Sequence, residues 1–593
     1  MPFQLSPGVN VSEIDLTTGI PAVATSIGAT AILAQWGPVE EVVTVGSEDD
    51  LVKRFWTPNN ENAVSWYTAA NFLAYGKNLK VSRAVSSAAT NATASGTGLL
   101  IKNDDHYELN YANGQGEVGE FAAMYPGLLG NSLTVSIADS ASFDSWDYKS
   151  EFDTSPGHNE FLMNKDTTSD PDTGNSNIND EIHVVVVDRL GLFSGVKGTV
   201  LERFPFLSKS PDAKTEAGAS AYYAQVLNRQ SQFVRWMDHP IDADGAPSTN
   251  WGTSFLGDDT ITYTLLTTPL TLDLSGGNDG NGALTAADFI NAFDMFADPD
   301  EIDVSLLLAG GDGPFVMSTG LDYTTVMARV ARIASDRKDA VAFVSPLYAD
   351  VVNNAGSETT SVLDTLRLGD NQMAMSHSQN SYAFADCNWK YQYDKYNDVY
   401  RWVPVNGDIA GLCAATDNTR DPWWSPAGFN RGNIKNVVRL AWNPKKADRD
   451  DLYKNSVNPV LNFPGDGTIL YGDKTMLAKP SAFDRVNVRR LFIVLEKAIA
   501  ISAKYSLFEF NDAFTRAQFV NMVEPFLRDV QGRRGIYDYR VVCDESNNTG
   551  EVIDRNEFVG DIYIKPAKSI NFIQLNFVAV RTGVDFSEVV GKF

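Results

Sequence analysis

The stretch 275–296, SGGNDGNGALTAADFINAFDMF, carries acidic and amide side chains at the spacing of a calcium-binding loop. An EF-hand loop needs oxygen ligands at alternate positions, a glycine at its sixth and a carboxylate at its twelfth. With Gly282 at position 6, Asp279 falls at position 3 and Asn281 at position 5. Position 1 is then Gly277, which has no side-chain ligand, and position 12 is Asp288 where glutamate is usual. The calcium reading is therefore disfavoured.

The residues around this turn favour a structural explanation. TPLTLDLSGG, which precedes it, has the pattern of a strand, whereas an EF-hand needs an entering helix. Thr285 can cap a helix that begins at Ala286, and Asp288 lies three residues later, where a carboxylate suits a positive helix N-terminus. The sequence predicts a strand, a glycine-bearing turn and a capped helix.

A second stretch, GDGTILYGDKT at 465–475, has part of a phosphate-binding pattern. Gly467 and Gly472 have the spacing of GxxxxGK[ST], but Asp473 is inserted before Lys474. The insertion shifts the lysine and places a carboxylate where phosphate charge would lie. The intervening TILY reads as a strand, so nucleotide binding is disfavoured.

Catalytic and metal-binding motifs are otherwise missing from the sequence. No GxSxG, HExxH or Cys/His pair occurs, and five histidines are scattered along the chain. Cys387, Cys413 and Cys543 are far apart and odd in number, which predicts free thiols. We expect no enzyme activity, no cofactor and no metal site.

The elements that surround these stretches indicate an α/β protein. IPAVATSIGATAILAQWGP reads as a strand, NAVSWYTAANFLAYG as an amphipathic helix and LKVSRAV as a second strand, which is the unit of a parallel sheet. The pattern resumes with IDVSLLLAGG, a helix carrying Val326, Val330 and Ile333, and the strand AVAFVSP. Between them lies an Asp-, Asn- and Gly-rich segment with the strand IHVVVVD and the helix EAGASAYYAQVLNRQ, which we interpret as an inserted outer domain.

The two ends of the chain read as extended segments. LSPGVNVSEIDL near the N-terminus alternates, with Val9, Val11 and Ile14 as its apolar positions, and no local partner. SINFIQLNFVAVRTG near the C-terminus is apolar on both alternating faces. Phe572 and Val578 lie on one face, and Leu575 and Phe577 lie on the other. The helix DRVNVRRLFIVLEKAIAISAKY precedes that end, with leucines on one side and Arg485, Arg489 and Arg490 on another. A strand apolar on both faces needs partners on both sides.

Charge is distributed unevenly. The net charge of −27 disfavours nucleic-acid binding, which needs a basic surface. Residues 1–380 hold 20 basic and 49 acidic residues, whereas residues 381–593 hold 28 and 26. This contrast predicts that the near-neutral C-terminal part faces partners and the acidic part faces solvent. No apolar run of about 18 residues occurs and the N-terminus lacks a secretory signal pattern, so we expect no membrane insertion.

Long runs of the sequence, in a fixed order, resemble the tail sheath proteins of contractile-tailed bacteriophages, in particular the T-even type. The runs include NWKYQYDKYNDVYRWVPVNGDIAGLCAATDN, WWSPAGFNRG, FDRVNVRRLF, SAKYSLFEFNDAFTR and YDYRVVCDESNNTGEVIDRNEFVGDIYIKPAKSINFIQLNFVAVRTGVDF. LSPGVNVSEID, AQWGP, NFLAYGKNLKVSRAV and GALTAADFINAFDMFADPDEIDVSLLLAG match the same family. The resemblance covers about 1–85, 121–137 and 271–593. Between about 86 and 120 this chain is short where the large T-even sheaths carry an extra outer domain.

The resemblance implies a structural subunit without catalysis. Sheath proteins stack as hexameric rings in a helix around the tail tube, and their terminal arms add strands to a small sheet in neighbouring subunits. The extended sheath is metastable, and its contraction drives the tube through the host envelope for genome delivery. Tail tube, baseplate and tail terminator proteins are the implied partners. The implied location is the virion tail, assembled in the host cytoplasm.

The resemblance and the residue patterns together predict a mixed α/β multidomain fold, with a core sheath domain built from both ends of the chain, an inserted outer domain and extended β arms. The expected segments are an arm at 1–20, core at 21–85, a linker or short insertion at 86–120, the acidic outer insertion at 121–270, an α/β part at 271–380 that continues the outer or middle domain, the inner core domain at 381–565 and a β arm at 566–593.

The expected functional residues fall into two groups. The predicted inter-subunit arms carry Val9, Val11, Ile14, Phe572, Leu575, Phe577, Val578 and Val580. The candidate tube contacts lie in the basic helix at 444–455 and are Lys445, Lys446, Arg449 and Lys454.

Two alternative functions stay open at this point. A sheath from a phage-derived bacteriocin or injection system would share the core. An acidic calcium-binding surface protein is the alternative from another class, and it rests on the acidic insertion and the Gly-Asn-Asp turns.

Overall fold

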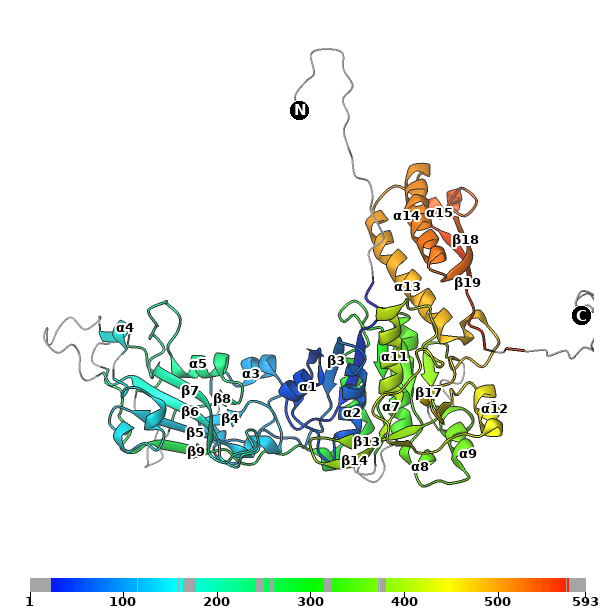
Figure 1. The fold of residues 1–593 in the computed structure, drawn as a ribbon. Helices are drawn as coiled ribbons and strands as arrows, with labels where there is room; N and C mark the ends of the chain where they lie inside the picture. The colour runs from blue at the N-terminus through cyan, green and yellow to red at the C-terminus, as the bar shows by residue number, and fades with distance from the viewer. Residues whose placement is uncertain are drawn as a thin grey trace, which may run out of the picture. The chain divides into compact units, whose positions relative to one another are not determined.

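The structure, a computed structural model drawn in Figure 1, describes most of the chain. The described residues are 23–114, 116–157, 159–163, 178–240, 250–255, 261–313, 322–371, 373, 380–571 and 573–574. Contacts divide the chain into two units. The larger unit comprises Ala22–Pro422 and Pro426–Lys497, and the described part of the smaller unit comprises Trp423–Ser425 and the residues from Ala498 onward.

A six-stranded sheet forms the centre of the larger unit. Its order is β12 (Ala383–Ala385), β11 (Val341–Val344), β10 (Leu306–Leu308), β1 (Gly28–Ile32), β3 (Leu79–Arg83) and β2 (Val42–Val45). All neighbours pair in parallel except β2, which runs antiparallel to β3 at the edge. The expected strand–helix–strand unit is confirmed, since β1 and β3 are parallel neighbours and α2 (Ala63–Leu73) connects them.

Helices cover both faces of this sheet because its strands are apolar on both sides. Leu307 points into a core shared with α6 (Ala286–Asp294) and α7 (Tyr323–Arg337). Its neighbours Leu306 and Leu308 point into a second core shared with α2 and α11 (Asn406–Thr419). The expected α/β fold is confirmed. The smaller helices of this part are α1 (Glu48–Phe55), α8 (Tyr348–Val351) and α9 (Glu358–Leu363).

The insertion between β3 and α6 has its own core and its own antiparallel sheet. The sheet order is β7 (Thr199–Ser208), β6 (Glu181–Asp188), β5 (Leu133–Asp139) and β9 (Leu270–Asp273), and a two-stranded sheet joins β4 (Phe121–Ala123) to β8 (Val234–Trp236). Its helices are α3 (Asp104–Asn110), α4 (Glu160–Met163) and α5 (Tyr223–Gln230). The predicted helix from Glu216 begins seven residues later, because Gly218 has a φ of +83° and forms a turn.

Several expected boundaries are wrong. The described residues of 86–120, expected to be a linker or short insertion, are the start of the insertion and not a linker: Thr90 and Thr93 form antiparallel bridges with Asn278 and Ser275, so the chain enters and leaves the insertion side by side. Residues 271–380, expected to be an α/β part that continues the outer or middle domain, supply β10 and β11 of the central sheet. The boundary expected at 381 is absent, since the larger unit continues to Lys497.

The remaining elements of the larger unit follow the central sheet. A three-stranded sheet has the order β14 (Val399–Pro404), β13 (Trp389–Asp394), β15 (Arg439–Leu440), and β16 (Val460–Phe463) pairs with β17 (Gly467–Leu470). α12 spans Lys446–Lys454. α13 spans Val486–Ala503, and its residues from Ala498 onward belong to the smaller unit.

The smaller unit contains α14 (Ala513–Gly532), β18 (Ile536–Val542), α15 (Gly550–Asp554) and β19 (Asp561–Pro566). β18 and β19 form an antiparallel two-stranded sheet. None of the described helices has the length and hydropathy of a membrane-spanning segment.

Candidate assembly surfaces

The glycine-bearing turn at 275–283 is a structural joint. Asp279 is buried and accepts a hydrogen bond from the Leu128 backbone N–H at 2.8 Å. Its pKa is raised by burial, although the Leu128 N–H and the Arg83 cation favour its charged form. Gly280 has a φ of +71°, which glycine adopts without strain. Among the described residues there is no group of three or more His, Cys, Asp or Glu side chains that could hold a metal ion.

The predicted cap of the following helix is present. α6 begins at Ala286, as expected, and the Thr285 backbone N–H donates to Asp288 Oδ2 at 2.8 Å. The Thr285 hydroxyl donates to the same oxygen, also at 2.8 Å. Asp288 therefore holds the N-cap residue and places negative charge at the helix N-terminus.

The phosphate-loop lookalike is also structural. Residues 467–470 form strand β17, as the sequence predicts. Lys474 Nζ donates to the Tyr453 carbonyl at 2.6 Å, and Asp473 lies 3.4 Å from Arg485. Lys474 and Asp473 therefore both have structural partners within the fold.

A buried ion pair between Arg490 and Asp417 binds the chain near residue 25, just after the N-terminal segment. Arg490 on α13 contacts both carboxylate oxygens of Asp417 on α11, at 2.5 and 2.9 Å. The Thr25 hydroxyl donates to Asp417 Oδ2 at 2.8 Å, and Arg490 donates to the Thr25 carbonyl at 3.2 Å. Burial alone would lower the pKa of Arg490, but the Asp417 carboxylate raises it. Residue 25, two places after the first described residue, is thereby tied to two helices.

The two arginines of α13, Arg489 and Arg490, are buried. Arg489 lies over the rings of Phe483 and Tyr382, at 3.9 and 4.2 Å from their centroids. The sequence could not reveal the partner of Arg490, because Asp417 lies 73 positions away and in a chain with 75 acidic residues.

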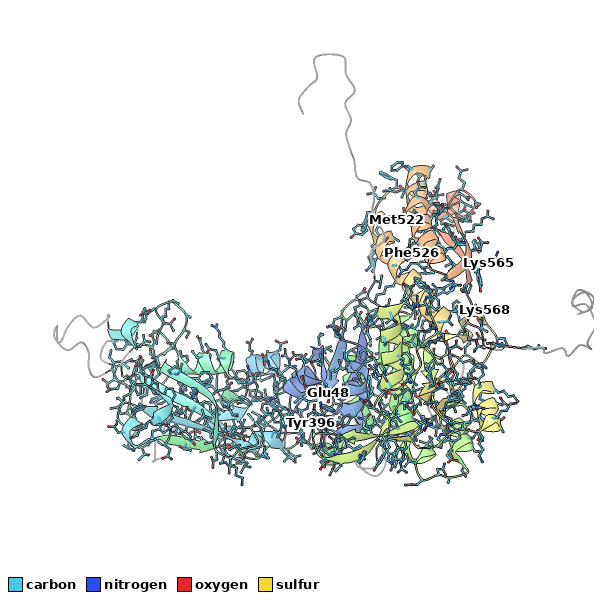
Figure 2. All side chains as sticks on the ribbon, viewed as in Figure 1. Glu48, Tyr396, Met522, Phe526, Lys565 and Lys568 are labelled. Carbon is cyan, nitrogen blue, oxygen red and sulfur yellow. The ribbon has the colours of Figure 1, made fainter. Side chains whose placement is uncertain are left out.

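The hairpin β18–β19 is the last sheet of the described chain before the C-terminal segment. β18 and β19 pair with each other and with no other described strand. Figure 2 labels Lys565 in β19 and Lys568 just beyond it, with Met522 and Phe526 one turn apart on α14. Tyr539 in β18 donates to the Glu524 carbonyl of α14 at 3.3 Å, so α14 covers one face of the hairpin.

The smaller unit exposes many apolar side chains. Between α13 and the first turn of α14, five aromatic or aliphatic side chains are each at least 63% exposed: Tyr505, Leu507, Phe508, Phe510 and Phe514. Ile570 and Ile573, which follow β19, are 83% and 78% exposed. Apolar surface on this scale marks an interaction region.

The predicted arm residues lie outside the described part of the chain. These are Val9, Val11, Ile14, Phe572, Leu575, Phe577, Val578 and Val580. The candidate tube contacts are described. Lys445, Lys446 and Lys454 are exposed and Arg449 is half-buried, all at or in α12. The same helix carries Asp448, Asp450 and Asp451, so its basic character is weaker than the sequence interpretation assumed.

Comparisons with known proteins agree on one family. The family model described as phage tail sheath protein central domain matches residues 283–476, and the phage tail sheath C-terminal domain matches residues 478–579. The tail sheath protein of Vibrio phage KVP40 is 34% identical, covering 99% of this chain and 100% of its own. The tail sheath protein of Enterobacteria phage T4 is 35% identical, covering 99% of both.

A solved structure supports the fold. The crystal structure of a sheath tail protein from Listeria innocua covers 92% of this chain and 96% of its own, with 12% identity and a TM-score of 0.50. The alignment with the Vibrio phage protein extends over 704 positions, more than the 593 residues of this chain. That relative therefore carries residues with no counterpart here.

Proposed function

The chain belongs to the phage tail sheath family, and on this premise we propose that its subunits are joined by exchanged strands and contract as a sheath around the tail tube. The prediction of a tail sheath subunit, a structural component of the phage tail, is confirmed by the full-length relatives. The proposal adds how such a subunit assembles and works.

The observation that carries the proposal is the hairpin β18–β19. A two-stranded sheet is marginal alone, and unpaired strand edges invite further strands. The apolar segment at 572–593 comes shortly after β19 in the sequence, and a segment with alternating apolar positions occupies 5–16. Terminal segments of neighbouring subunits would add to the hairpin edges, where backbone hydrogen bonds give affinity and alternating side chains give register.

The exposed apolar side chains of the smaller unit support the same proposal. Phe508, Phe510 and Phe514 expose surface that water would disfavour in a free monomer. Burial against neighbouring chains would stabilise an assembly by roughly 25 cal/mol per Å² of apolar area. Head-to-tail contacts of this kind do not close, so they build a helical stack of rings. We take those rings to be hexameric, as the family resemblance implies.

Contraction in this proposal needs no nucleotide and no catalysis. The extended sheath is metastable, and a bistable interface between subunits switches to a tighter arrangement. A few hundred Å² of extra apolar burial per subunit would release on the order of several kcal/mol, summed over the tail. This work drives the tube through the host envelope.

The partners follow from the charge distribution and the family. The near-neutral C-terminal part would face the tail tube, with Lys445, Lys446, Arg449 and Lys454 as candidate contacts, and the acidic insertion would face outward. Baseplate and tail terminator proteins would cover the two ends of the sheath. Assembly in the host cytoplasm completes this proposal.

The arm part of the proposal is tested by removing apolar side chains at constant length. The triple variant Val9→Asp, Val11→Asp and Ile14→Asp is expected to remain a folded monomer that forms no cylinders, because its strand cannot pack on a neighbour. Sedimentation and negative-stain microscopy measure the polymer, and thermal unfolding measures the fold. The matched control is Thr17→Asp with Thr18→Asp, which should still polymerise. Normal cylinders from the triple variant would refute the exchanged arm.

A further inference from the structure

Two lysine–aspartate pairs are fully buried in the larger unit, and their carboxyl groups are held differently. In the insertion, Lys209 Nζ lies 3.1 Å from Asp139 Oδ2, and both side chains are 0% exposed. In the central part, Lys390 Nζ on β13 lies 2.8 Å from Oδ2 and 2.9 Å from Oδ1 of Asp408, at the start of α11 (Figure 1). These two side chains are 0% and 1% exposed. A buried charged group must be compensated by its surroundings, or it becomes neutral.

The surroundings of Asp139 suit a charged carboxylate. The Leu266 backbone N–H donates to Oδ2 at 2.7 Å. The Ala141 backbone N–H and the Ser142 hydroxyl donate to Oδ1, at 3.2 and 3.0 Å. Hydrogen bonds to the charged form of a carboxyl group favour that form. Lys209 Nζ also donates to two backbone carbonyls, at 3.2 and 3.0 Å, so this pair is an ion pair with both charges compensated.

The carboxyl group of Asp408 has fewer donors. The Tyr75 hydroxyl donates to Oδ1 at 3.1 Å. Oδ2 is buried and accepts no hydrogen bond from the described residues, although Lys390 Nζ is close to it. The second oxygen of Asp408 therefore lacks the donors that stabilise the charge of Asp139.

Burial acts against charge in this second pair. It lowers the pKa of Lys390 and raises the pKa of Asp408, although each of the two charges favours the other. Asp386 is a further buried carboxyl group nearby. Burial raises its pKa to about 8, and the negative charge of Asp408 adds to that shift. The site therefore favours a neutral amine beside a neutral carboxylic acid.

The geometry of this pair contains the parts of an amide-forming reaction. Lys390 Nζ is nearly equidistant from the two oxygens of Asp408, so it lies close to the carbon between them, where a nucleophile must be. The Tyr75 hydroxyl is in place to stabilise negative charge that develops on Oδ1. The Lys435 backbone N–H donates to the Tyr75 oxygen at 2.7 Å and fixes it. Burial raises the pKa of Tyr75, so its hydroxyl stays protonated and remains a donor.

We propose that Lys390 and Asp408 of the folded subunit join in an intramolecular isopeptide bond, which links β13 covalently to α11. The lone pair of the neutral Nζ forms a bond to Cγ of the protonated carboxyl group, and Oδ1 takes the negative charge beside the Tyr75 hydroxyl. A proton then moves from Nζ to the Oδ2 hydroxyl, the bond from Cγ to Oδ2 breaks, and Oδ2 leaves as water. An amine and a carboxylic acid thus give an amide and one water, with no oxidant or further reactant. The inference does not depend on the proposed polymer.

The test is the mass of the purified full-length protein, measured after denaturation. The protein is expected to be lighter than its sequence mass by one water molecule. A tryptic digest locates the bond: the peptide 368–395, uncleaved after Lys390, should be joined to the peptide 402–420, which contains Asp408. The pair in the insertion is an internal control. The peptides 103–149 and 204–209, which contain Asp139 and Lys209, should be found separately.

Two variants test the roles of the named groups. Lys390→Met removes the nucleophile and should have its full sequence mass. Tyr75→Phe keeps both reacting groups and removes the donor to Oδ1, so the bond should form roughly a hundredfold more slowly in a time course after synthesis. Melting temperatures show whether each variant is folded. An unchanged rate in a folded Tyr75→Phe variant would remove Tyr75 from the reaction.

The wild-type measurement decides the inference without any variant. A wild-type protein with its full sequence mass would overturn it. A missing water that maps to other residues, or a bond between Lys209 and Asp139 in place of the expected one, would overturn it as well. None of these results measures polymerisation, so each would leave the proposed function standing.

Discussion

At the scale of residues, Arg490 is a cation held away from water, and its stability there depends on Asp417. Both side chains are only 4% exposed, and the Thr25 hydroxyl donates a further hydrogen bond to the Asp417 carboxylate. Breaking one partner of such a pair leaves an uncompensated buried charge, whereas replacing both partners by apolar groups avoids that cost. The ion pair therefore fixes Thr25, near the start of the described chain, to α11 and α13.

A double-mutant comparison tests this lock. Asp417→Asn is expected to lower the free energy of unfolding by about 3–5 kcal/mol, because Arg490 stays buried without its countercharge. Arg490→Met combined with Asp417→Leu should cost less than that single change. Urea unfolding monitored by tryptophan fluorescence measures both. A double variant less stable than the single variant would show that the charges are not what holds the site.

His183 in β6 is a titratable group that the insertion keeps neutral. The Phe206 backbone N–H donates to Nδ1 at 3.0 Å, so Nδ1 carries a lone pair, and Nε2 lies 2.9 Å from the Thr154 carbonyl, to which it donates. The ring stacks on Phe152 at 4.3 Å. Burial lowers the pKa of His183 below its ordinary value.

The sign of the resulting pH dependence follows from that direction. The unfolded chain binds the proton at a higher pH than the folded chain, so the stabilisation is complete above about pH 6.5 and is lost as the pH falls through the lowered pKa of the folded state. His183→Gln should flatten the slope of stability against pH below 6.5 by up to about 1.4 kcal/mol per unit. Urea midpoints at pH 5, 6 and 7 provide the comparison, and parallel wild-type and variant curves would contradict it.

At the scale of elements, α12 carries the candidate tube contacts on a helix of mixed charge. Lys445, Lys446 and Arg449 share it with Asp450 and Asp451, so the helix alone is not strongly basic. Exposed ion contacts steer association and are individually weak. A tube contact here would act on recruitment of subunits to the tube and would be sensitive to salt.

The prediction for α12 compares two kinds of assembly. Lys445→Gln, Lys446→Gln and Arg449→Gln together should weaken polymerisation on added tail tubes by roughly three- to tenfold, because the attraction between charged surfaces is lost. Polymerisation without tubes should change less than twofold. Asp450→Asn with Asp451→Asn is the control on the same helix and should not weaken the tube-templated reaction. Equal effects of the lysine and arginine changes on both reactions would remove the tube assignment.

Elements with local signals were the ones that sequence patterns predicted well. The cap at Thr285 and Asp288, the strand at 467–470 and the strand–helix–strand unit around α2 each depend on residues within a few positions. Long-range partners were not predictable. The buried polar residues Gln392 and Asp394 of β13 are an example, because their partners Asn71 and Tyr67 lie 321 and 327 positions away in the sequence.

At the scale of the whole molecule, the domain boundaries were the weakest prediction, for a physical reason. A change in composition marks where the surface becomes more acidic, and this need not be a domain boundary. The central sheet contains β10 and β11 from one side of the expected boundary at 381 and β12 from the other. Parallel strands that pair in one sheet can be far apart in sequence. The sequence alone therefore does not show which strands belong to the same sheet. The charge contrast itself is real, with 27 acidic and 10 basic residues in 86–280.

The central claim is that neighbouring subunits complete the β18–β19 sheet with their terminal segments. A helical reconstruction of cylinders formed by the purified full-length protein tests it most directly. The account predicts additional strands paired to β18 and β19 whose side-chain density fits residues 5–16 or 572–593 of other copies. A well-ordered cylinder in which both edges of this hairpin stay free of other chains would contradict it.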